Sequence, residues 1–261
     1  MAEQTATAKS QKKKQLQILV VDIGGNHVKI LASGQKVVIK FPSGPNLKPR
    51  QMVSEVLKAT SDWDYDVVSI GYPGMVLRGK PVAEPYNLGK GWVGFDFAAA
   101  FCRSVKLLND AAMQAIGSYD GGKMLFLGLG TGLGSTMIVD GVVEPVELGH
   151  LPYRKATYED YVGKRALKFL GKKKWRRYVE DVIERLSAAL EPEYIVIGGG
   201  NARKLKRLPV NCKYGQNANA FMGGFMLWEN DNKAQPAHTG GINTALIAAS
   251  RPTGRPKLRV S

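Results

Sequence analysis

The chain has 261 residues, of which 44% are hydrophobic and 23% are charged, as is typical of a folded soluble protein with a sizeable core. Its two cysteines, Cys102 and Cys212, are too few for a disulfide framework or a four-thiolate zinc site, so we expect reduced buried thiols and a cytoplasmic location. No apolar stretch follows the polar N-terminus, and glycines interrupt the most apolar window, residues 124–143. We therefore expect no signal peptide and no membrane span.

The net charge of +15 is concentrated in a few segments. Residues 164–177 carry eight positive charges and no acid, and smaller excesses lie in residues 1–14, 203–207 and 251–259. Such patches are usually solvated faces, and otherwise they attract a polyanion such as nucleic acid or polyphosphate.

The first half of the chain begins with a predicted hairpin. Apolar, β-branched runs at residues 16–23 and 28–32 flank Gly24-Gly25 and are followed by a strand at 37–41. We then expect a helix at 51–60, a strand at 67–70, a helix at 98–103, a strand at 105–108 and a helix at 111–117. The intervening loop, residues 71–97, is rich in Gly and Pro, and a loop of this length tends to be functional.

The second half repeats this order. Strands at 123–129 and 134–139 flank a glycine turn, and a capping box from Thr157 to Asp160 opens a helix expected to end at Gly171, with Phe169 on its inward face. A second helix at 174–190 leaves Lys172, Lys173 and Lys174 in the turn between the two. A strand at 194–197 and a helix at 216–229 follow.

Two similar α/β lobes across a cleft fit this order, and such a cleft is a natural ligand site. The expected organisation is a basic tail at 1–15, lobes at 16–115 and 116–250, and a flexible basic tail at 251–261.

The turns of the two hairpins have the residues of a phosphate site. In the first, Gly24 and Gly25 expose backbone N–H groups beside Asn26 and Lys29, and Asp22 can hold a hydrated Mg²⁺ that bridges phosphate oxygens. The second offers the same kind of nest at Gly130, Thr131 and Gly132. A plain Gly-Gly hairpin turn is the alternative for the first of these.

Several motifs in one order resemble the sugar kinases of the repressor–open reading frame–kinase (ROK) family. They are the two hairpins, Asn109-Asp110 at a strand end, and Glu147-Leu148-Gly149-His150. Residues 71–74, residues 86–88 with Trp92, and the stretch from Trp175 to Gly200 are most similar to the polyphosphate-using glucokinases of that family. The resemblance implies the α/β actin-like ATPase fold, with two ribonuclease H-like lobes around a central cleft.

The resemblance also implies roles for particular residues. Asp110 would be the catalytic base, because phosphoryl transfer to a hydroxyl needs a carboxylate that orients the hydroxyl and accepts its proton. The implied sugar site comprises Gly74, Asn87, Asn109, Asp110, Glu147 and His150. Glu159 is either a further sugar contact or part of the helix cap, and Asn109-Asp110 alone would be read as a turn or cap.

The implied phosphoryl donor is inorganic polyphosphate, ATP or both. A long polyanion needs a positive track beyond the reaction centre, and two segments are candidates. One contains Lys172, Lys173 and Lys174. The other is residues 203–207, which follow Gly198, Gly199, Gly200 and Asn201, the stretch that flanks the nucleotide in ATP-using relatives.

Two departures from the family pattern matter. Asn26 stands where the family usually has threonine. No cysteine-rich loop follows His150, so structural zinc is not expected, and the metal expected is Mg²⁺ at Asp22. A homodimer is a family-level expectation only.

The expected reaction is therefore transfer of a phosphoryl group to the 6-hydroxyl of glucose, with another hexose such as mannose as an alternative acceptor. A non-catalytic sugar-binding regulator of the same family is the second alternative. It would need a DNA-binding helix-turn-helix ahead of the first strand, where about 15 residues stand. A nucleic-acid-binding protein is the third, and it lacks the usual motifs. We expect neither a membrane nor a specific nucleic acid as partner.

Overall fold

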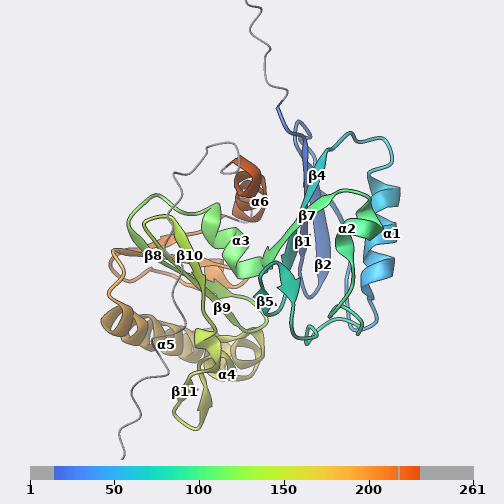
Figure 1. The fold of residues 1–261 in the computed structure, drawn as a ribbon. Coiled ribbons are helices and arrows are strands. Elements are labelled where there is room, and N and C mark those ends of the chain that lie inside the picture. The colour runs from blue at the N-terminus through green and yellow to red at the C-terminus, as the bar shows by residue number, and fades with distance from the viewer. Residues whose placement is uncertain (1–14, 217, 230–261) are drawn as a thin grey trace, which may run out of the picture.

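The computed structural model describes residues 15–216 and 218–229, which form two five-stranded sheets with helices around them (Figure 1). The tails expected at 1–15 and 251–261 lie outside the described residues, apart from residue 15. No helix in the described ranges is both long enough and apolar enough to cross a membrane.

The first sheet has the strand order β3-β2-β1-β4-β7. Its strands are β1 (Ile18–Ile23), β2 (His27–Ala32), β3 (Ile39–Pro42), β4 (Val67–Tyr72) and β7 (Ser104–Asn109). β1 pairs antiparallel with β2 and parallel with β4, and β4 pairs parallel with β7. All residues of β1 and β4 are buried, as a continuous apolar run predicts for a central strand covered on both faces.

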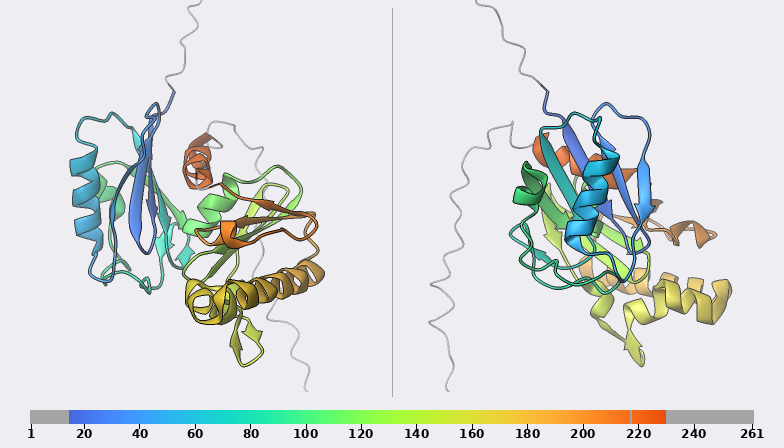
Figure 2. Two further views of the ribbon diagram at one scale, coloured as in Figure 1. Left: turned by 180° about the vertical axis from the view of Figure 1, so that it is seen from behind. Right: turned by 90° about the vertical axis from the view of Figure 1, so that its right-hand side faces the viewer.

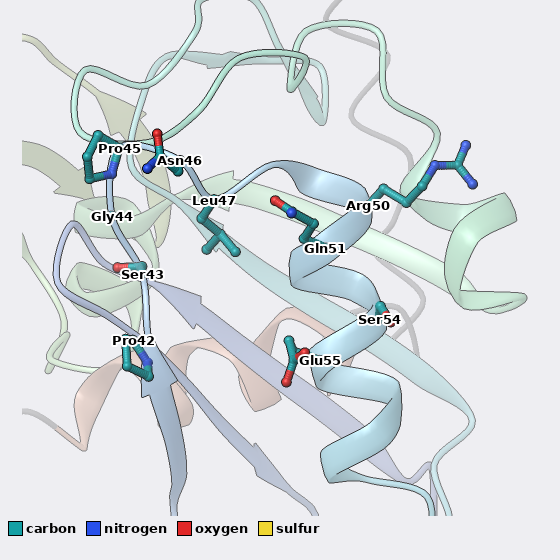
Figure 3. A pocket seen from close by; sticks show the side chains of 10 residues that line it. All are labelled: Pro42, Ser43, Gly44, Pro45, Asn46, Leu47, Arg50, Gln51, Ser54 and Glu55. Carbon is teal, nitrogen blue, oxygen red and sulfur yellow. The ribbon is translucent and has the colours of Figure 1, made fainter.

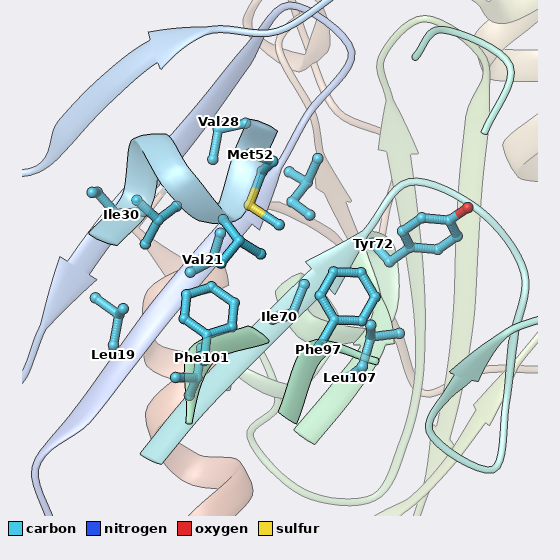
Figure 4. Packing of buried hydrophobic residues seen from close by; sticks show 14 of the residues in the cluster. Leu19, Val21, Val28, Ile30, Met52, Ile70, Tyr72, Phe97, Phe101 and Leu107 are labelled. Atoms are coloured by element: carbon cyan, nitrogen blue, oxygen red, sulfur yellow. The ribbon is translucent and has the colours of Figure 1, made fainter. Parts of the chain in front are cut away.

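Helices cover both faces of this sheet. On one face, α1 (Pro49–Ala59) and α2 (Phe97–Phe101) pack over a core that includes Val21, Met52 and Phe101 (Figure 4). On the other face, α6 (Asn219–Glu229) contributes Phe221 to a cluster with Val20. Alternate residues of β1 therefore feed two separate cores.

The second sheet repeats the first, with the order β10-β9-β8-β13-β14. Its strands are β8 (Lys123–Leu129), β9 (Leu133–Val139), β10 (Val142–Pro145), β13 (Tyr194–Gly198) and β14 (Cys212–Tyr214). β8 pairs antiparallel with β9 and parallel with β13, which matches the pairing around β1. α4 (Tyr158–Val162) and α5 (Lys164–Leu190) cover one face, and α5 runs along the second lobe in Figure 2. Both predicted glycine-turn hairpins are thus confirmed.

Helix α3 (Asp110–Ile116) lies between the two sheets (Figure 1). It contacts β4 and β7 of the first sheet, β8 and β9 of the second, and α6. A Cβ on Gly223 of α6 would collide with the main-chain oxygen of Met113, so the two helices cross with their backbones close together. The expected lobe boundary at residue 115 assigns α6 to the second lobe, whereas α6 contacts β1 and β4 of the first sheet.

Shorter elements complete the chain. They are β5 (Val76–Leu77), β6 (Lys80–Pro81), β11 (Pro152–Tyr153), β12 (Ala156–Thr157) and the 3-10 helices η1 (Leu148–His150) and η2 (Ala202–Lys204). The strands β5 and β6 form a small hairpin within the long loop predicted at residues 71–97.

The predicted break between two helices at Gly171 is confirmed, and a second break, at Gly163, was not predicted. The helix capped by Thr157 and Asp160 ends already at Gly163, and the chain re-enters a helix at Lys164. At Gly171, φ of 72° and ψ of 163° kink α5 within a single residue, so no turn is needed and Lys172–Lys174 belong to the helix. Phe169, expected on the inward face, is 88% exposed, whereas Ala166 and Leu170 of the same segment pack against the core as expected.

The expectation of two buried thiols is wrong for one of them. Cys102 is exposed at the C-cap of α2, in a left-handed conformation with φ of 51°. Cys212 is half-buried in β14, and burial raises the pKa of its thiol to about 11.

Candidate active site

Three parallel strands of the first sheet end side by side, and their carboxyl ends carry the central candidates. Asp22 near the end of β1 lies opposite Gly71 of β4, and Tyr72 lies opposite Asn109, the last residue of β7. Asp110 follows immediately and begins α3. Ligands of open α/β sheets bind at such strand ends, so the topology places Asp22 and Asp110 at one edge.

Asn109 holds the start of α3 in place. Its Oδ1 accepts hydrogen bonds from the backbone N–H groups of Ala111 (2.9 Å) and Ala112 (3.2 Å), and its Nδ2 donates to the main-chain oxygen of Gly74 (3.0 Å). The side chain is therefore a helix cap, which is the structural role that an Asn-Asp pair predicts by itself. The same contacts bring two sugar-site candidates, Asn109 and Gly74, together beside Asp110.

Asp110 has the electrostatics of a proton acceptor at neutral pH. Burial, reinforced by the carboxylates of Asp22 and Glu147, raises the pKa of Asp110 to about 7, although a hydrogen bond from the Ala111 N–H opposes the shift. Asp22 comes from the first lobe and Glu147 from the second. Carboxylates of both lobes therefore act on the ionisation of Asp110.

The first hairpin is braced by a residue that the motifs did not single out. Ser43 donates from Oγ to the main-chain oxygen of Gly24 (2.6 Å) and from its backbone N–H to that of Asn26 (3.0 Å). A Cβ on Gly25 would lie 3.4 Å from Cβ of Asn87, which puts this sugar-site candidate beside the hairpin. No sequence pattern marks Ser43, because its role depends on β3 pairing with β2.

Lys29 and Asp22 form an ion pair, with Nζ 2.8 Å from Oδ2. The side chain of Asp22 is buried, while that of Lys29 is 39% exposed. Among the described residues, no group of three or more His, Cys, Asp or Glu side chains could hold a metal ion. One carboxylate nonetheless fits Mg²⁺, because this ion is usually bound by one or two carboxylates plus waters and substrate phosphates. The expectation of no structural zinc stays a prediction.

The second hairpin lies beside the start of α3. A Cβ on Gly134 would approach Cβ of Ala111, the residue after Asp110, to 3.0 Å. The turn is held by the backbone N–H of Lys164, which donates to the main-chain oxygens of Gly130 and Thr131, both at 3.0 Å. The start of α5 therefore fixes the turn that contains three phosphate-site candidates.

Glu159 faces this turn rather than capping its own helix. The acid that caps α4 is Asp160, whose Oδ2 accepts from Oγ1 of Thr157 (2.7 Å) and from its backbone N–H (3.1 Å). The carboxylate of Glu159 instead fills the space where a Cβ of Gly132 would lie, and its Oε1 is 3.8 Å from Nε2 of His150. The capping explanation of Glu159 is thus excluded.

Glu147 lies in an exposed segment just before η1. A second unpredicted serine anchors this segment, since Oγ of Ser135 donates to the main-chain oxygen of Val146 (2.6 Å) and accepts from the N–H of Leu148 (3.0 Å). Ser135 lies on β9, two residues after the start of this strand of the second hairpin. The candidates Glu147, His150 and Glu159 are thereby tied to the same part of the second lobe.

The triple glycine packs against the base of the second hairpin. A Cβ on Gly198 would meet the ring of Phe126, and one on Gly199, whose φ is 81°, would lie 2.6 Å from the main-chain oxygen of Leu129. Gly200 faces open space. The buried Asn201 donates from Nδ2 to the main-chain oxygen of Gly130 (3.0 Å), so this stretch and the hairpin form one unit.

The two basic segments meet next to this unit. Lys204 donates from Nζ to Oδ1 of Asn201 (2.6 Å), and Arg176 of α5 donates from Nε to the main-chain oxygen of Lys204 (2.6 Å). Lys172, Lys173 and Lys174 are exposed on α5, about one helical turn before Arg176. The two segments predicted as alternative tracks therefore touch at Arg176 and Lys204, and their role as a track stays a prediction.

The fold, with two related sheets around α3 and candidate residues at the strand ends, is the actin-like ATPase fold of ROK sugar kinases. The polyphosphate/ATP-glucomannokinase from Arthrobacter sp. strain KM superposes with a TM-score of 0.73 at 22% identity, over 83% of this chain and 100% of that one. A ROK family glucokinase from Streptomyces griseus, solved with glucose and AMPPNP, gives 0.67 at 16% identity, over 82% and 99%. No protein-family model matches the chain.

The chain is also similar in sequence to curated proteins named polyphosphate glucokinase. The polyphosphate glucokinase of Mycobacterium leprae is 30% identical over 213 residues, which are 72% of this chain and 64% of that protein. The polyphosphate glucokinase of Mycobacterium tuberculosis is 28% identical over 243 residues, 79% of this chain and 89% of that one. The chain is thus a relative of polyphosphate glucokinases, and the resemblance to ROK sugar kinases is confirmed.

Proposed function

We propose that this protein is a sugar kinase that transfers the terminal phosphoryl group of inorganic polyphosphate or ATP to the 6-hydroxyl of glucose. The names of its relatives support this reaction. The observation that carries the proposal is that Asp110, at the strand ends, has its pKa raised by burial and by the carboxylates of Asp22 in the first lobe and Glu147 in the second. These are the candidate metal ligand and a candidate sugar ligand.

In this mechanism, Asp110 accepts the proton of the 6-hydroxyl as its oxygen attacks the terminal phosphorus. The bond from phosphorus to the bridging oxygen breaks, and the shortened polyphosphate or ADP leaves with the electron pair. A pKa near 7 allows Asp110 to be ionised before transfer and protonated after it, close to the optimum for a base at neutral pH. Most of the remaining work is positioning and charge stabilisation.

The phosphates would lie between the two hairpins. The backbone N–H groups around Gly24–Asn26 and Gly130–Gly132 supply donors, and the Lys29 ammonium supplies positive charge. Asp22 would hold Mg²⁺, which when bound neutralises charge on the phosphate oxygens. Because Lys29 pairs with Asp22, the ammonium would turn toward phosphate when the metal takes the carboxylate.

The sugar would lie against Asn87, Asn109, Glu147, His150 and Glu159, with the backbone at Gly74. The contact between His150 and Glu159, and the anchoring of Glu147 through Ser135, support a single polar site on the second lobe. Asn109 retains one N–H for a ligand, since its oxygen and its bond to Gly74 are committed to the fold. A neighbour named a glucomannokinase makes mannose the second acceptor to test.

A coupled assay for glucose 6-phosphate tests the function directly. The full chain is incubated with glucose and Mg²⁺ and with either polyphosphate or ATP as donor, and mannose is tested in parallel by following donor consumption. We expect glucose 6-phosphate with at least one donor. Binding of glucose without turnover from either donor would instead favour the sugar-binding regulator, since a ROK family transcriptional regulator shares this fold with a TM-score of 0.63.

A further inference from the structure

The first lobe carries a pocket in addition to the cleft. It has a cavity volume of about 690 Å³ and lies between α1 and the segment that connects β3 to α1 (Figure 3). Its polar side chains are Ser43, Asn46, Arg50, Gln51, Ser54 and Glu55. The apolar lining comes from Pro42, Pro45 and Leu47.

The lining favours a neutral ligand with many hydroxyl groups. In Figure 3, Gln51 and Glu55 reach from α1 toward the connecting segment that carries Ser43 and Asn46. Amides, hydroxyls and a carboxylate together offer both donors and acceptors, as a hydroxyl-rich ligand requires. The opposite charges of Arg50 and Glu55 balance, which favours a ligand without net charge, and covering six polar side chains with an apolar ligand would leave them unpaired at a cost.

The size of the pocket argues against a single hexose. Pockets for compact ligands span ~300–1,000 Å³. A cavity of about 690 Å³ lies in the middle of that range and exceeds what one hexose ring fills. The prolines and Leu47 give the C–H faces of a sugar chain an apolar surface on which to pack.

We propose that this pocket binds a short neutral oligosaccharide of hexose units, at a site separate from the one that receives the phosphoryl group. Oligosaccharide binding at this pocket does not depend on the proposed function. Its effect on turnover does rest on the proposed function, because the segment that lines the pocket supports both proposed substrate sites.

That support is visible in two contacts. Ser43 holds the first hairpin through Gly24 and Asn26, as described above. The main-chain oxygen of Leu47 accepts a hydrogen bond from the N–H of Gly89 at 3.0 Å, two residues beyond Asn87. An occupant that immobilises residues 43–47 therefore stiffens the hairpin and the loop of Asn87, and it should lower the KM for the phosphoryl donor.

The test is a titration of maltotriose into the isotopically labelled full chain, saturated with glucose and without donor, followed by amide chemical shifts. We expect shifts at Asn46, Gln51 and Ser54. Asn46→Ala and Glu55→Ala should each weaken maltotriose binding ~5-fold, the typical effect of one lost hydrogen bond. Lys58→Ala, an exposed change on the same helix outside the pocket, should leave it unchanged.

Three results would overturn the site. Maltotriose could fail to shift these amides, Glu55→Ala could bind it as well as the unchanged chain, or inorganic phosphate could shift them at lower concentration than maltotriose. Because no donor is present, these results do not depend on whether the chain is a kinase. If maltotriose binds but leaves the KM for the donor unchanged in the coupled assay, the coupling is wrong.

Discussion

The guanidinium of Arg176 is hydrogen-bonded to the main-chain oxygen of Lys204 at 2.6 Å, and this contact joins two basic segments that are 28 residues apart in sequence. Through Lys204 and Asn201, the joined surface reaches the main-chain oxygen of Gly130 in the second hairpin. A chain of phosphates held at that hairpin would therefore have basic residues of both segments nearby.

Charge reversal of Lys172, Lys173 and Lys174 to Glu tests this surface. Because many phosphate contacts act together on a polyanion, we expect the KM for polyphosphate to rise at least ~10-fold at physiological salt. ATP carries only three phosphates, so its KM should change little. The exposed double change Lys36→Glu and Lys58→Glu is the control. Unchanged polyphosphate-driven turnover in the triple variant would refute the track.

Asn201→Ala tests the link between the triple glycine and the second hairpin. The buried amide makes two side-chain hydrogen bonds, and their loss should lower the free energy of unfolding by ~1–3 kcal/mol. The turn at Gly130 would loosen, so the KM for the donor should rise while glucose binding stays within a factor of about two. Denaturant titration and donor kinetics measure the two effects. An equal loss of glucose affinity would contradict a role confined to the donor side.

The pKa of Asp110 has a consequence for stability. A carboxyl whose pKa is raised to about 7 in the fold binds its proton more tightly there than in the unfolded chain, so stability falls as the pH rises from about 4 to about 7. Asp110→Asn removes this effect and should raise the free energy of unfolding at pH 8 by ~1–3 kcal/mol, with little change at pH 4. If the difference in free energy of unfolding between the variant and the unchanged chain were the same at pH 4 and at pH 8, the raised pKa would be contradicted.

The same group should govern the acid limb of activity. With Asp110 as base, kcat/KM should fall about tenfold per pH unit below its pKa. Because the Asp22 carboxylate helps to raise that pKa, a metal ion bound at Asp22 should lower it and move the limb to lower pH. The measurement is a pH profile at low and high Mg²⁺. If the acid limb lies at the same pH at low and high Mg²⁺, the metal does not bind at Asp22.

The crossing of α3 and α6 places a glycine of α6 against the helix that begins at Asp110. Gly223→Ala would drive a methyl group into the main-chain oxygen of Met113, three residues after Asp110. We expect a loss of ~2 kcal/mol or more in the free energy of unfolding. Met222→Ala, at a side chain that is 51% exposed, is the matched control on the neighbouring residue. If the two variants had similar free energies of unfolding, the backbones of α3 and α6 would have room for a methyl group at residue 223, contrary to the prediction.

The sequence was most informative where local chemistry decides the structure. Glycine-containing turns between apolar runs predicted both hairpins, and Thr157 with Asp160 predicted the cap of α4. Gly171 was correctly predicted to end a helix, but the break at Gly163 was missed. Phe169 was misplaced because an apolar residue at helical spacing need not lie on the covered face.

Other features depend on tertiary contacts that no local pattern encodes. Ser43 and Ser135 brace the site through partners brought near by strand pairing, and Glu159 points to Gly132 only because α4 packs under the hairpin. The joining of the two basic segments likewise required the position of α5 relative to η2.

The most direct test of the account is the turnover of Asp110→Asn in the glucose 6-phosphate assay, with glucose affinity measured on the same sample. Loss of a general base costs ~10²–10⁴ in rate, so we predict turnover lower by at least two orders of magnitude with either donor and a Kd for glucose within about threefold of the unchanged chain. A folded Asp110→Asn variant that forms glucose 6-phosphate at a near-normal rate would contradict the central role of this carboxylate.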